Sequence, residues 1–203
     1  MRPKVILLTE IISPYRIPVF NEIAKILGDE FLVLFFGESE KRREWKIYKE
    51  KIRFRNEVLP GILFQKEGSN PYFLNPSLFS RLVRYSPEIV ILGGYQHPSS
   101  LVTLIYAKLF KRNIIVWCES NKRDQRSRLL FKEAYKRWFV RNCDGYIAPG
   151  KASVEYLASL GASPKKVRIA VNAVDNDYFR QASDKYRDTK EGLKKSKGYT
   201  GKL

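Results

Sequence analysis

The sequence predicts an α/β fold: a single doubly wound domain with a mostly parallel sheet of about seven strands and helices on both faces. Short aliphatic or β-branched runs recur from the first residues to about residue 180, and helical patterns separate them. Most runs are apolar throughout rather than alternating, as strands buried on both faces of a parallel sheet require. Strands and helices that alternate along the chain build such a sheet, with right-handed crossovers.

The predicted strands share an uninterrupted or nearly uninterrupted apolar run. They cover residues 5–8, 31–36, 52–59, 89–92, 114–118, 146–148 and 167–171. The first helix follows Pro18, whose fixed φ suits a first helical turn, and ends at Gly28. The second opens at Asn75-Pro76 and ends before Pro87.

Three more helices complete the predicted order. His97-Pro98-Ser99 opens the third, which stays largely apolar to Leu109. The fourth runs from about residue 127 to 142, and the fifth covers 151–160 and is closed by Gly161. The stretch 172–177 reads as a turn and a short exit from the domain, because Asn and Asp favour turns.

The length of 203 residues suits one domain and a tail, whereas a two-lobed enzyme is hard to fit. We expect a domain over residues 1–180 and a basic, disordered tail over residues 181–203. In the tail, leucine is the only aliphatic residue larger than alanine, so little apolar surface is available to order it.

Composition restricts the partners and the compartment. The net charge of +17 indicates a polyanionic partner, a phosphorylated ligand or an anionic membrane. Two cysteines without a pairing framework favour a reducing cytosol, and a single histidine argues against a zinc site, so no metal is expected. The first apolar run is too short for a signal sequence or a membrane span. We therefore expect a cytoplasmic protein, with peripheral contact at the inner face of the cell membrane as an option.

Candidate ligand-binding residues lie where the predicted strands end, since open α/β sheets bind ligands beyond the carboxyl ends of their strands. Gly93 and Gly94 let the backbone approach a ligand before a helix begins, although the same residues also suit a plain tight turn. Glu119 ends the fifth strand and suits either a ligand hydroxyl or a helix start. A third glycine at the spacing of a dinucleotide fingerprint is missing, so NAD binding is disfavoured.

Two basic, aromatic segments are candidate contacts with an anionic surface. One is the predicted helix over 127–142, whose apolar face fits the core better than a membrane. The other covers residues 41–55 and holds eight basic side chains. An alternative to an enzyme is thus a basic module that binds nucleic acid or anionic membrane. Against nucleic acid, the sequence has no recognition motif such as a helix-turn-helix.

Five stretches carry a resemblance to a known family: Thr9 to Phe20 (TEIISPYRIPVF), Ile91 to Tyr95 (ILGGY), Trp117 to Ser120 (WCES), Tyr146 to Gly150 (YIAPG) and Asn172 to Asp175 (NAVD). Together they resemble the N-terminal domain of glycosyltransferase family 4, whose members are retaining, GT-B-fold enzymes that use nucleotide sugars. The resemblance covers residues 4 to 180. It implies a Rossmann-like lobe that binds the acceptor and faces a second, nucleotide-sugar-binding lobe, which we expect to be absent from this chain. Many relatives have a glycine pair where this chain has Ser13 to Arg16, and a histidine in place of Gly93-Gly94.

The resemblance also implies roles for individual residues. Glu119 and His97 are the candidate catalytic residues, and Tyr15 and Arg16 are expected near phosphate. The candidate acceptor-binding residues are Gly93, Gly94, Tyr95, Ser120, Arg123, Arg126 and Asn172.

The implied activity is transfer of a hexosyl unit to a glycan or lipid-linked acceptor in polysaccharide biosynthesis. No cofactor is expected apart from a nucleotide sugar as co-substrate. Whether this chain is itself an enzyme stays open at this point, since it is expected to be inactive without a separate donor-binding lobe.

Overall fold

Seven parallel strands form the sheet of the computed structural model, which describes residues 1–40, 43, 45–65, 71–124, 130–187 and 189–198. The strand order is β3-β2-β1-β6-β7-β8-β9. The bounds are β1 (Val5–Thr9), β2 (Phe31–Phe35), β3 (Arg55–Val58), β6 (Ile89–Leu92), β7 (Asn113–Trp117), β8 (Gly145–Ala148) and β9 (Val167–Ile169). All seven strands expected from the apolar runs are present, so the predicted fold class is confirmed.

The central strands are buried as their sequences predict. Every residue of β2 is buried, and so is every residue of β1 except Val5. Residues of the edge strand β3 alternate between half-buried and exposed, because successive side chains of a strand point to opposite faces of the sheet. β3 is also shorter and more polar than the apolar run over 52–59 that predicted it.

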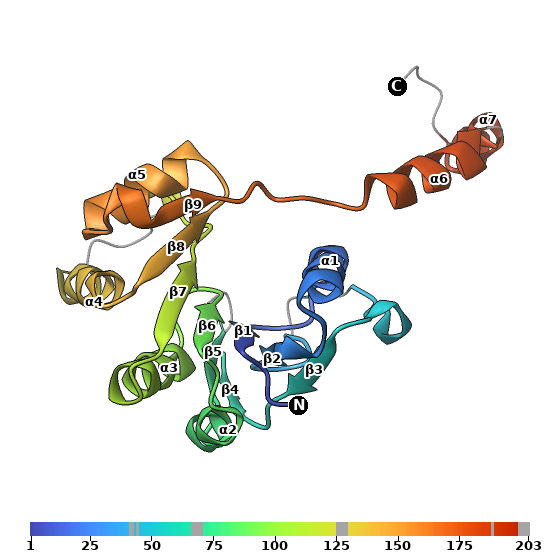
Figure 1. Cartoon of the computed structure of the whole chain (residues 1–203). Helices are drawn as coiled ribbons and strands as arrows, with labels where there is room; N and C mark the ends of the chain where they lie inside the picture. The colour runs from blue at the N-terminus through green and yellow to red at the C-terminus, as the bar shows by residue number, and fades with distance from the viewer. Residues whose placement is uncertain (41–42, 44, 66–70, 125–129, 188, 199–203) are drawn as a thin grey trace. The chain divides into compact units, whose positions relative to one another are not determined.

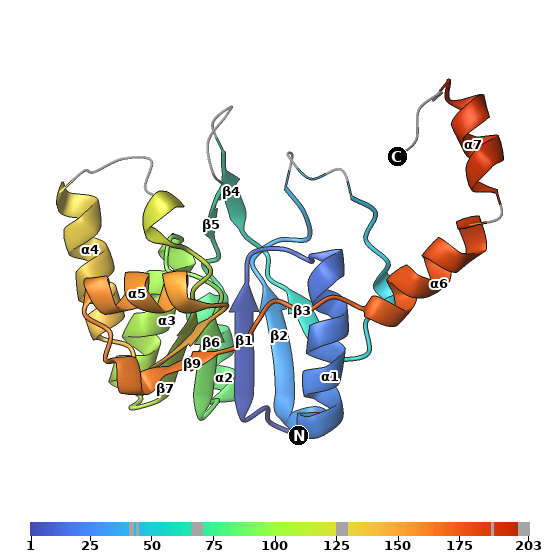
Figure 2. The same cartoon turned by 90° about the horizontal axis from the view of Figure 1, so that it is seen from above.

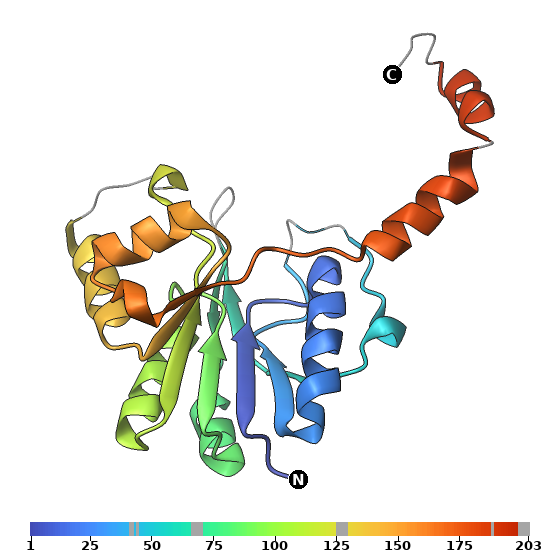
Figure 3. The same cartoon turned by 45° about the horizontal axis from the view of Figure 1, so that its top comes forward.

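The strand order reverses at β1, which pairs in parallel with β2 on one side and with β6 on the other. Leu8 is in register with both Leu34 and Leu92. The arrowheads of β1 and β6 point the same way in Figure 3, so the segments that follow these two strands leave from one edge of the sheet. In open α/β sheets this reversal leaves a crevice for ligands at that edge.

Helices cover both faces of the sheet, with α1 on one side and α2 and α3 on the other (Figure 1). The bounds are α1 (Ile17–Leu27), α2 (Leu78–Tyr85), α3 (Pro98–Leu109), α4 (Leu130–Arg141) and α5 (Lys151–Leu160). Two apolar clusters correspond to the two faces. One joins Phe20 of α1 to Leu7 and Val33, and the other joins α2, α3, α4 and α5 to the alternate strand residues such as Leu8. The first residues of the predicted fourth helix, 127–129, lie outside the described residues.

A short antiparallel hairpin, β4 (Ile62–Phe64) and β5 (Tyr72–Leu74), was not expected from the sequence. It extends past the arrowheads of β1 and β2 in Figure 2. One of its faces is held against the core by Phe73, which is buried and lies 6.4 Å from Phe36 between ring centroids. The hairpin therefore depends on contacts distant in sequence, which no local pattern reveals.

Asn75, expected to open the second helix, instead ties the hairpin to the sheet. Its buried side-chain amide donates to the carbonyl of Phe36 at 2.9 Å, while α2 begins only at Leu78. The carbonyl of Phe36, just after β2, thus accepts a hydrogen bond from a side chain rather than from a neighbouring strand.

The chain divides into two compact units, residues 1–172 and 173–203, and the expected domain boundary at residue 180 stays a prediction. The second unit contains α6 (Asn176–Arg187) and α7 (Lys190–Ser196), where the sequence predicts a turn and then a disordered tail. No residue of α6 is buried, and ion pairs one turn apart, such as Arg180 with Asp177, lie along it. The tail's lack of a core of its own is consistent with its composition, and its disorder stays a prediction.

Candidate functional site

A cavity of about 220 Å³ lies at the carboxyl edge of the sheet, beside the point where the strand order reverses. Segments that follow β1, β2, β6 and β7 enclose it. Its lining residues are Thr9, Glu10, Ile11, Ser13, Tyr15, Arg16, Glu40, Arg43, Trp45, Gly93, Gly94, Tyr95, Gln96, Trp117, Cys118, Glu119 and Ser120. The rule that places ligands beyond strand ends therefore locates the cavity correctly.

The loop after β1 brings Tyr15 and Arg16, the two expected phosphate-binding residues, to the wall of the cavity. The Arg16 guanidinium forms a hydrogen-bonded ion pair with Glu119 and lies 5.1 Å from the centre of the Trp117 ring. Tyr15 is half-exposed and meets Trp45 edge-on, with ring centroids 6.1 Å apart. Arg16 thus presents a cation that is held from two sides, while its contact with phosphate stays a prediction.

The loop after β6 supplies a wall made of backbone. A Cβ at Gly93 would lie 3.2 Å from the Leu8 carbonyl, and Gly94 adopts φ +103°, a region that side chains disfavour. Both glycines therefore allow the chain to turn this closely past the end of β1. This geometry supports their role in a tight turn, and a ligand can still approach the same backbone.

Tyr95 lines the cavity, yet its side chain belongs to the core. Its ring centroid lies 5.8 Å from that of Phe139, and its hydroxyl is 3.3 Å from the hydroxyl of Tyr156. Burial is the main cause that raises the pKa of Tyr95 well above its ordinary value of 10.0. The hydroxyl stays neutral and already has a partner, so the part of Tyr95 available to a ligand is its backbone.

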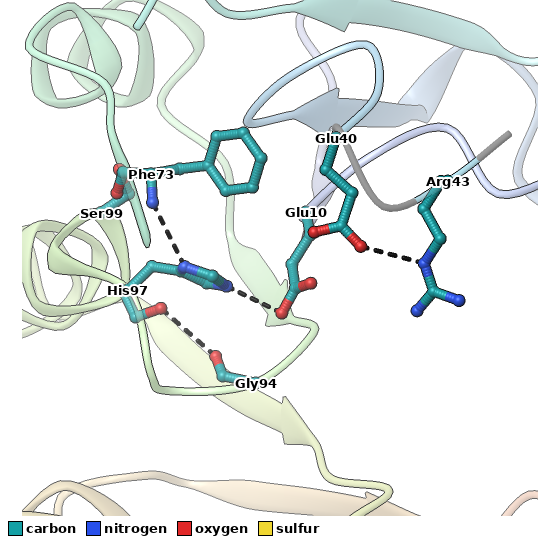
Figure 4. A network of polar contacts seen from close by, with 8 residues as sticks. Glu10, Glu40, Arg43, Phe73, Gly94, His97 and Ser99 are labelled. Atoms are coloured by element: carbon teal, nitrogen blue, oxygen red, sulfur yellow. Dashed lines mark hydrogen bonds and ion pairs between the residues drawn. The ribbon is translucent and has the colours of Figure 1, made fainter. Parts of the chain in front are cut away.

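His97, a candidate catalytic residue in the sequence, lies behind the wall of the cavity rather than on it. Its side chain is only 2% exposed, and its Nε2 lies 2.7 Å from Oε1 of Glu10, which does line the cavity (Figure 4). The backbone N–H of Phe73 donates to the other ring nitrogen, Nδ1, at 3.4 Å. Many relatives have a histidine in place of Gly93-Gly94. In this chain the histidine lies further along, at position 97, and supports the wall of the cavity from behind.

The remaining predicted residues are divided between the cavity and the surface. Glu119 and Ser120 line the cavity, and Ser153 of α5 donates a hydrogen bond to the Glu119 carbonyl at 3.4 Å. Arg123 and Asn172 are exposed and are not among the lining residues. Arg126 lies outside the described residues.

Ten of the seventeen lining residues were not proposed as site residues from the sequence, among them Glu10, Glu40, Arg43 and Trp45. The Arg43 guanidinium lies 4.8 Å from the Trp45 ring centre, and its Nε donates to the buried carboxylate of Glu40 at 2.9 Å. Arg43 and Trp45 belong to the basic segment 41–55, which the sequence marks only as a surface contact. The position of Glu10, directly after β1, is the signal that was available.

The cavity combines three carboxylates with two guanidinium groups stacked on indole rings. Carboxylates accept hydrogen bonds from hydroxyl groups, and guanidinium groups bind phosphate or carboxylate. The set therefore suits a ligand rich in hydroxyl groups that also carries negative charge. Among the residues that the structure describes, no three His, Cys, Asp or Glu side chains gather where they could hold a metal ion.

The family is decided by the sequence itself, because the model of glycosyltransferase family 4 matches residues 21–178. The chain belongs to glycosyltransferase family 4. The match contains the loops after β2, β6 and β7 that enclose the cavity, while the loop after β1 precedes it. No curated protein matches this family 4 chain in sequence.

Solved structures similar to this family 4 chain include nucleotide-sugar proteins. HepE from Anabaena, in complex with UDP-glucose, is 16% identical with a TM-score of 0.61, over 91% of this chain and 49% of that one. UDP-GlcNAc 2-epimerase from Neisseria meningitidis, bound to UDP-GlcNAc, is 16% identical with a TM-score of 0.58, over 97% and 54%. At these identities the likeness establishes the shared Rossmann-like, GT-B fold.

The family 4 chain spans about half the length of these structures. Within the part that the structure describes, none of its helices has both the length and the apolar character needed to cross a membrane.

Proposed function

We propose that this chain is the acceptor-binding half of a retaining, nucleotide-sugar-dependent glycosyltransferase that transfers a hexosyl unit to a glycan or lipid-linked acceptor. The observation that carries the proposal is the cavity beside the strand reversal, in a family 4 domain, lined by three carboxylates and two stacked arginines. Such a lining suits the hydroxyl groups of a sugar and an anionic group beside them.

The two similar structures support a nucleotide sugar as the donor, because one is bound to UDP-glucose and the other to UDP-GlcNAc. This chain corresponds to about half of each. We therefore assign donor binding mainly to a second lobe that faces the cavity, and we expect the chain alone to be inactive.

Within this proposal the paired residues have complementary roles. Arg16, with Tyr15 beside it, meets the anionic group, and Glu119 accepts a hydrogen bond from an acceptor hydroxyl while it holds Arg16 in place. Gly93, Gly94 and Ser120 let the acceptor approach the backbone. His97 has no direct contact with the ligand in this scheme, since its side chain is buried behind Glu10.

The proposal is tested by amide-resolved NMR titration of the purified chain with a panel of methyl glycosides of common hexoses and N-acetylhexosamines. We expect at least one glycoside to shift the signals of Gly93, Gly94 and the Trp117 indole. UDP-glucose and UDP-GlcNAc, incubated with the same protein, should show no turnover. Shifts confined to residues outside the cavity would contradict the proposal. So would an activity that copurifies with the protein and turns over either nucleotide sugar.

The high positive charge supports peripheral contact with an anionic membrane at the cytoplasmic face. Cosedimentation with phosphatidylglycerol vesicles, and none with phosphatidylcholine vesicles, is the expected result, reduced by salt because exposed charges are screened. Equal binding to both kinds of vesicle would remove the electrostatic basis. A filter-binding titration with DNA at several salt concentrations checks the competing nucleic-acid reading, for which we expect only weak, salt-sensitive retention.

A further inference from the structure

We propose that Glu10, in addition to Glu119, accepts a hydrogen bond from a ligand hydroxyl group in the cavity, and that His97 is the positioning residue that fixes the Glu10 carboxylate there. The identity of the ligand as a sugar rests on the proposed function. The pairing itself rests on the geometry alone: Glu10 follows β1 on the wall of the cavity, and the buried imidazole of His97 lies directly behind it.

The Glu10 carboxylate has one oxygen engaged and one available. Oε1 lies 2.7 Å from Nε2 of His97, a short and direct hydrogen bond. Oε2 accepts no hydrogen bond from the residues that the structure describes, and the side chain is 38% exposed. One oxygen therefore anchors the group and leaves the second for a hydroxyl donor.

The imidazole of His97 is a rigid support. The rings of Phe36, Tyr72 and Phe73 meet it edge-on, with centroids 5.5, 6.4 and 5.6 Å away. The Phe73 N–H donates to Nδ1, so Nδ1 carries no proton and the neutral ring holds its proton on Nε2. That proton points to Glu10, which fixes the direction of the hydrogen bond: Nε2–H donates and Oε1 accepts.

The neutral partner distinguishes Glu10 from the other two glutamates of the cavity. Glu119 is paired with Arg16 and Glu40 with Arg43, so a guanidinium offsets the charge of each. Among the described residues, Glu10 pairs with the imidazole of His97 instead, and no guanidinium pairs with it. A charged acceptor makes a stronger hydrogen bond to a neutral hydroxyl group, and a carboxylate already held in place loses less rotational freedom on binding.

The first experiment reads the imidazole directly, with or without a ligand. The chain has one histidine, so long-range ¹H–¹⁵N correlation of the untagged, ¹⁵N-labelled protein at pH 7.5 reports on His97 alone. We expect the neutral form with its proton on Nε2. Glu10→Gln should keep that tautomer, which Phe73 sets, but shift the Nε2–H signal and speed its exchange with water. Glu119→Gln, the control inside the cavity, should leave both unchanged.

A proton on Nδ1, a charged ring, or an Nε2–H signal indifferent to Glu10→Gln would each overturn the positioning role. These outcomes concern the imidazole and do not touch the proposed function.

The second experiment measures binding of whichever methyl glycoside shifts the wild-type spectrum. We expect Glu10→Gln to weaken it at least tenfold, and His97→Ala to weaken it by a similar factor. His97→Gln should restore most of the affinity, because the glutamine amide can donate from near the position of Nε2. Glu38→Gln, an exposed glutamate outside the lining residues, should bind as the wild type does.

The outcomes separate the two proposals. Binding that survives Glu10→Gln but is lost in Glu119→Gln would overturn the role of Glu10 and leave the proposed function standing. Failure of every glycoside to bind the wild type would overturn the sugar ligand and the function with it, and the imidazole spectrum would still decide the pairing. If His97→Ala does not fold, His97→Gln and Glu10→Gln carry the comparison.

Discussion

Arg16 and Glu119 form an ion pair that joins the segments following β1 and β7, two strands separated in the sheet by β6. The pair therefore spans the end of the strand between them, and both of its residues line the cavity. The Trp117 ring supports the guanidinium, so the cation is held near a fixed position.

Removing the charge of Glu119 should release Arg16 to bind anions. We expect Glu119→Gln to raise the affinity for pyrophosphate by about three- to tenfold, because a competing carboxylate is lost, a change of about 1 kcal/mol. Arg16→Gln should abolish the binding. Isothermal titration with pyrophosphate at low salt measures both, and Lys25→Gln, an exposed cation of α1, is the control. Unchanged pyrophosphate affinity in both variants would remove Arg16 from the phosphate-binding residues.

The stability of the fold should decline above about pH 9, partly through Cys143. Burial is the main cause that raises the pKa of this thiol from the ordinary 9.0 to about 12. Below pH 9 the thiol is neutral in both states and its contribution is fully present. Between pH 9 and 12 only the unfolded chain ionises, so the free energy of unfolding falls as the pH rises.

Urea unfolding at pH 8 and pH 10 checks this effect. Cys143→Ala should lose about 1.4 kcal/mol less between the two pH values than the wild type does, whatever its stability at pH 8. Burial is the main cause that raises the pKa of Tyr146 to about 12, and the Cys143 thiol is a smaller one, so most of the alkaline loss from Tyr146 is common to both proteins. Parallel curves for the two proteins would show that the Cys143 thiol ionises equally in the folded and unfolded chains.

Gly94 should tolerate alanine poorly for conformational reasons alone. A Cβ at Gly94 meets nothing within 4 Å, but φ is +103°, so Gly94→Ala should cost about 1–2 kcal/mol. Gly150 offers a matched control, because its Cβ position is equally open while φ is 179°. Gly150→Ala should change stability by less than about 0.5 kcal/mol, since lower chain entropy offsets a poorer helix cap. Thermal unfolding of both variants measures the difference, and equal costs would contradict the strain at Gly94.

Ser99 should contribute to stability through the buried network that fixes the hairpin. Its hydroxyl accepts from the Asn75 N–H at 3.1 Å and lies 2.9 Å from Oδ1 of Asn75. Ser99→Ala leaves these buried groups without a partner and should cost about 1–3 kcal/mol in urea unfolding. Ser80→Ala removes an exposed hydroxyl that bonds only the Ser77 carbonyl, so we expect a cost below about 0.5 kcal/mol. Similar costs for both would place the importance of Ser99 elsewhere.

The sheet could be predicted because its information is local. A buried parallel strand requires a continuous apolar run, and helix ends at Gly28 and Gly161 are marked by the residues themselves. The hairpin escaped prediction since its strands have three residues each and its pairing depends on Phe73 reaching the core. The helix over 176–187 was not predicted either, because the Asn and Asp residues at its start favour a turn.

The candidate site could be predicted as far as topology determines it. Parallel strands bring Gly94 and Glu119 to one edge, and both line the cavity as expected. The pairing of Glu10 with His97 joins residues 87 positions apart, and that of Arg16 with Glu119 joins residues 103 apart. Side-chain pairs of this kind depend on rotamers and packing, which a single sequence does not display.

The bond from the Phe73 amide to His97 connects the hairpin to the cavity through one imidazole ring. Thermodynamic coupling is reciprocal, so we expect an occupant that immobilises Glu10 to restrain β5 as well. The Phe73 amide would then exchange its hydrogen with deuterium more slowly whenever the cavity is filled. The exchange rate of the Phe73 amide would therefore report whether the cavity is occupied, although Phe73 does not line the cavity.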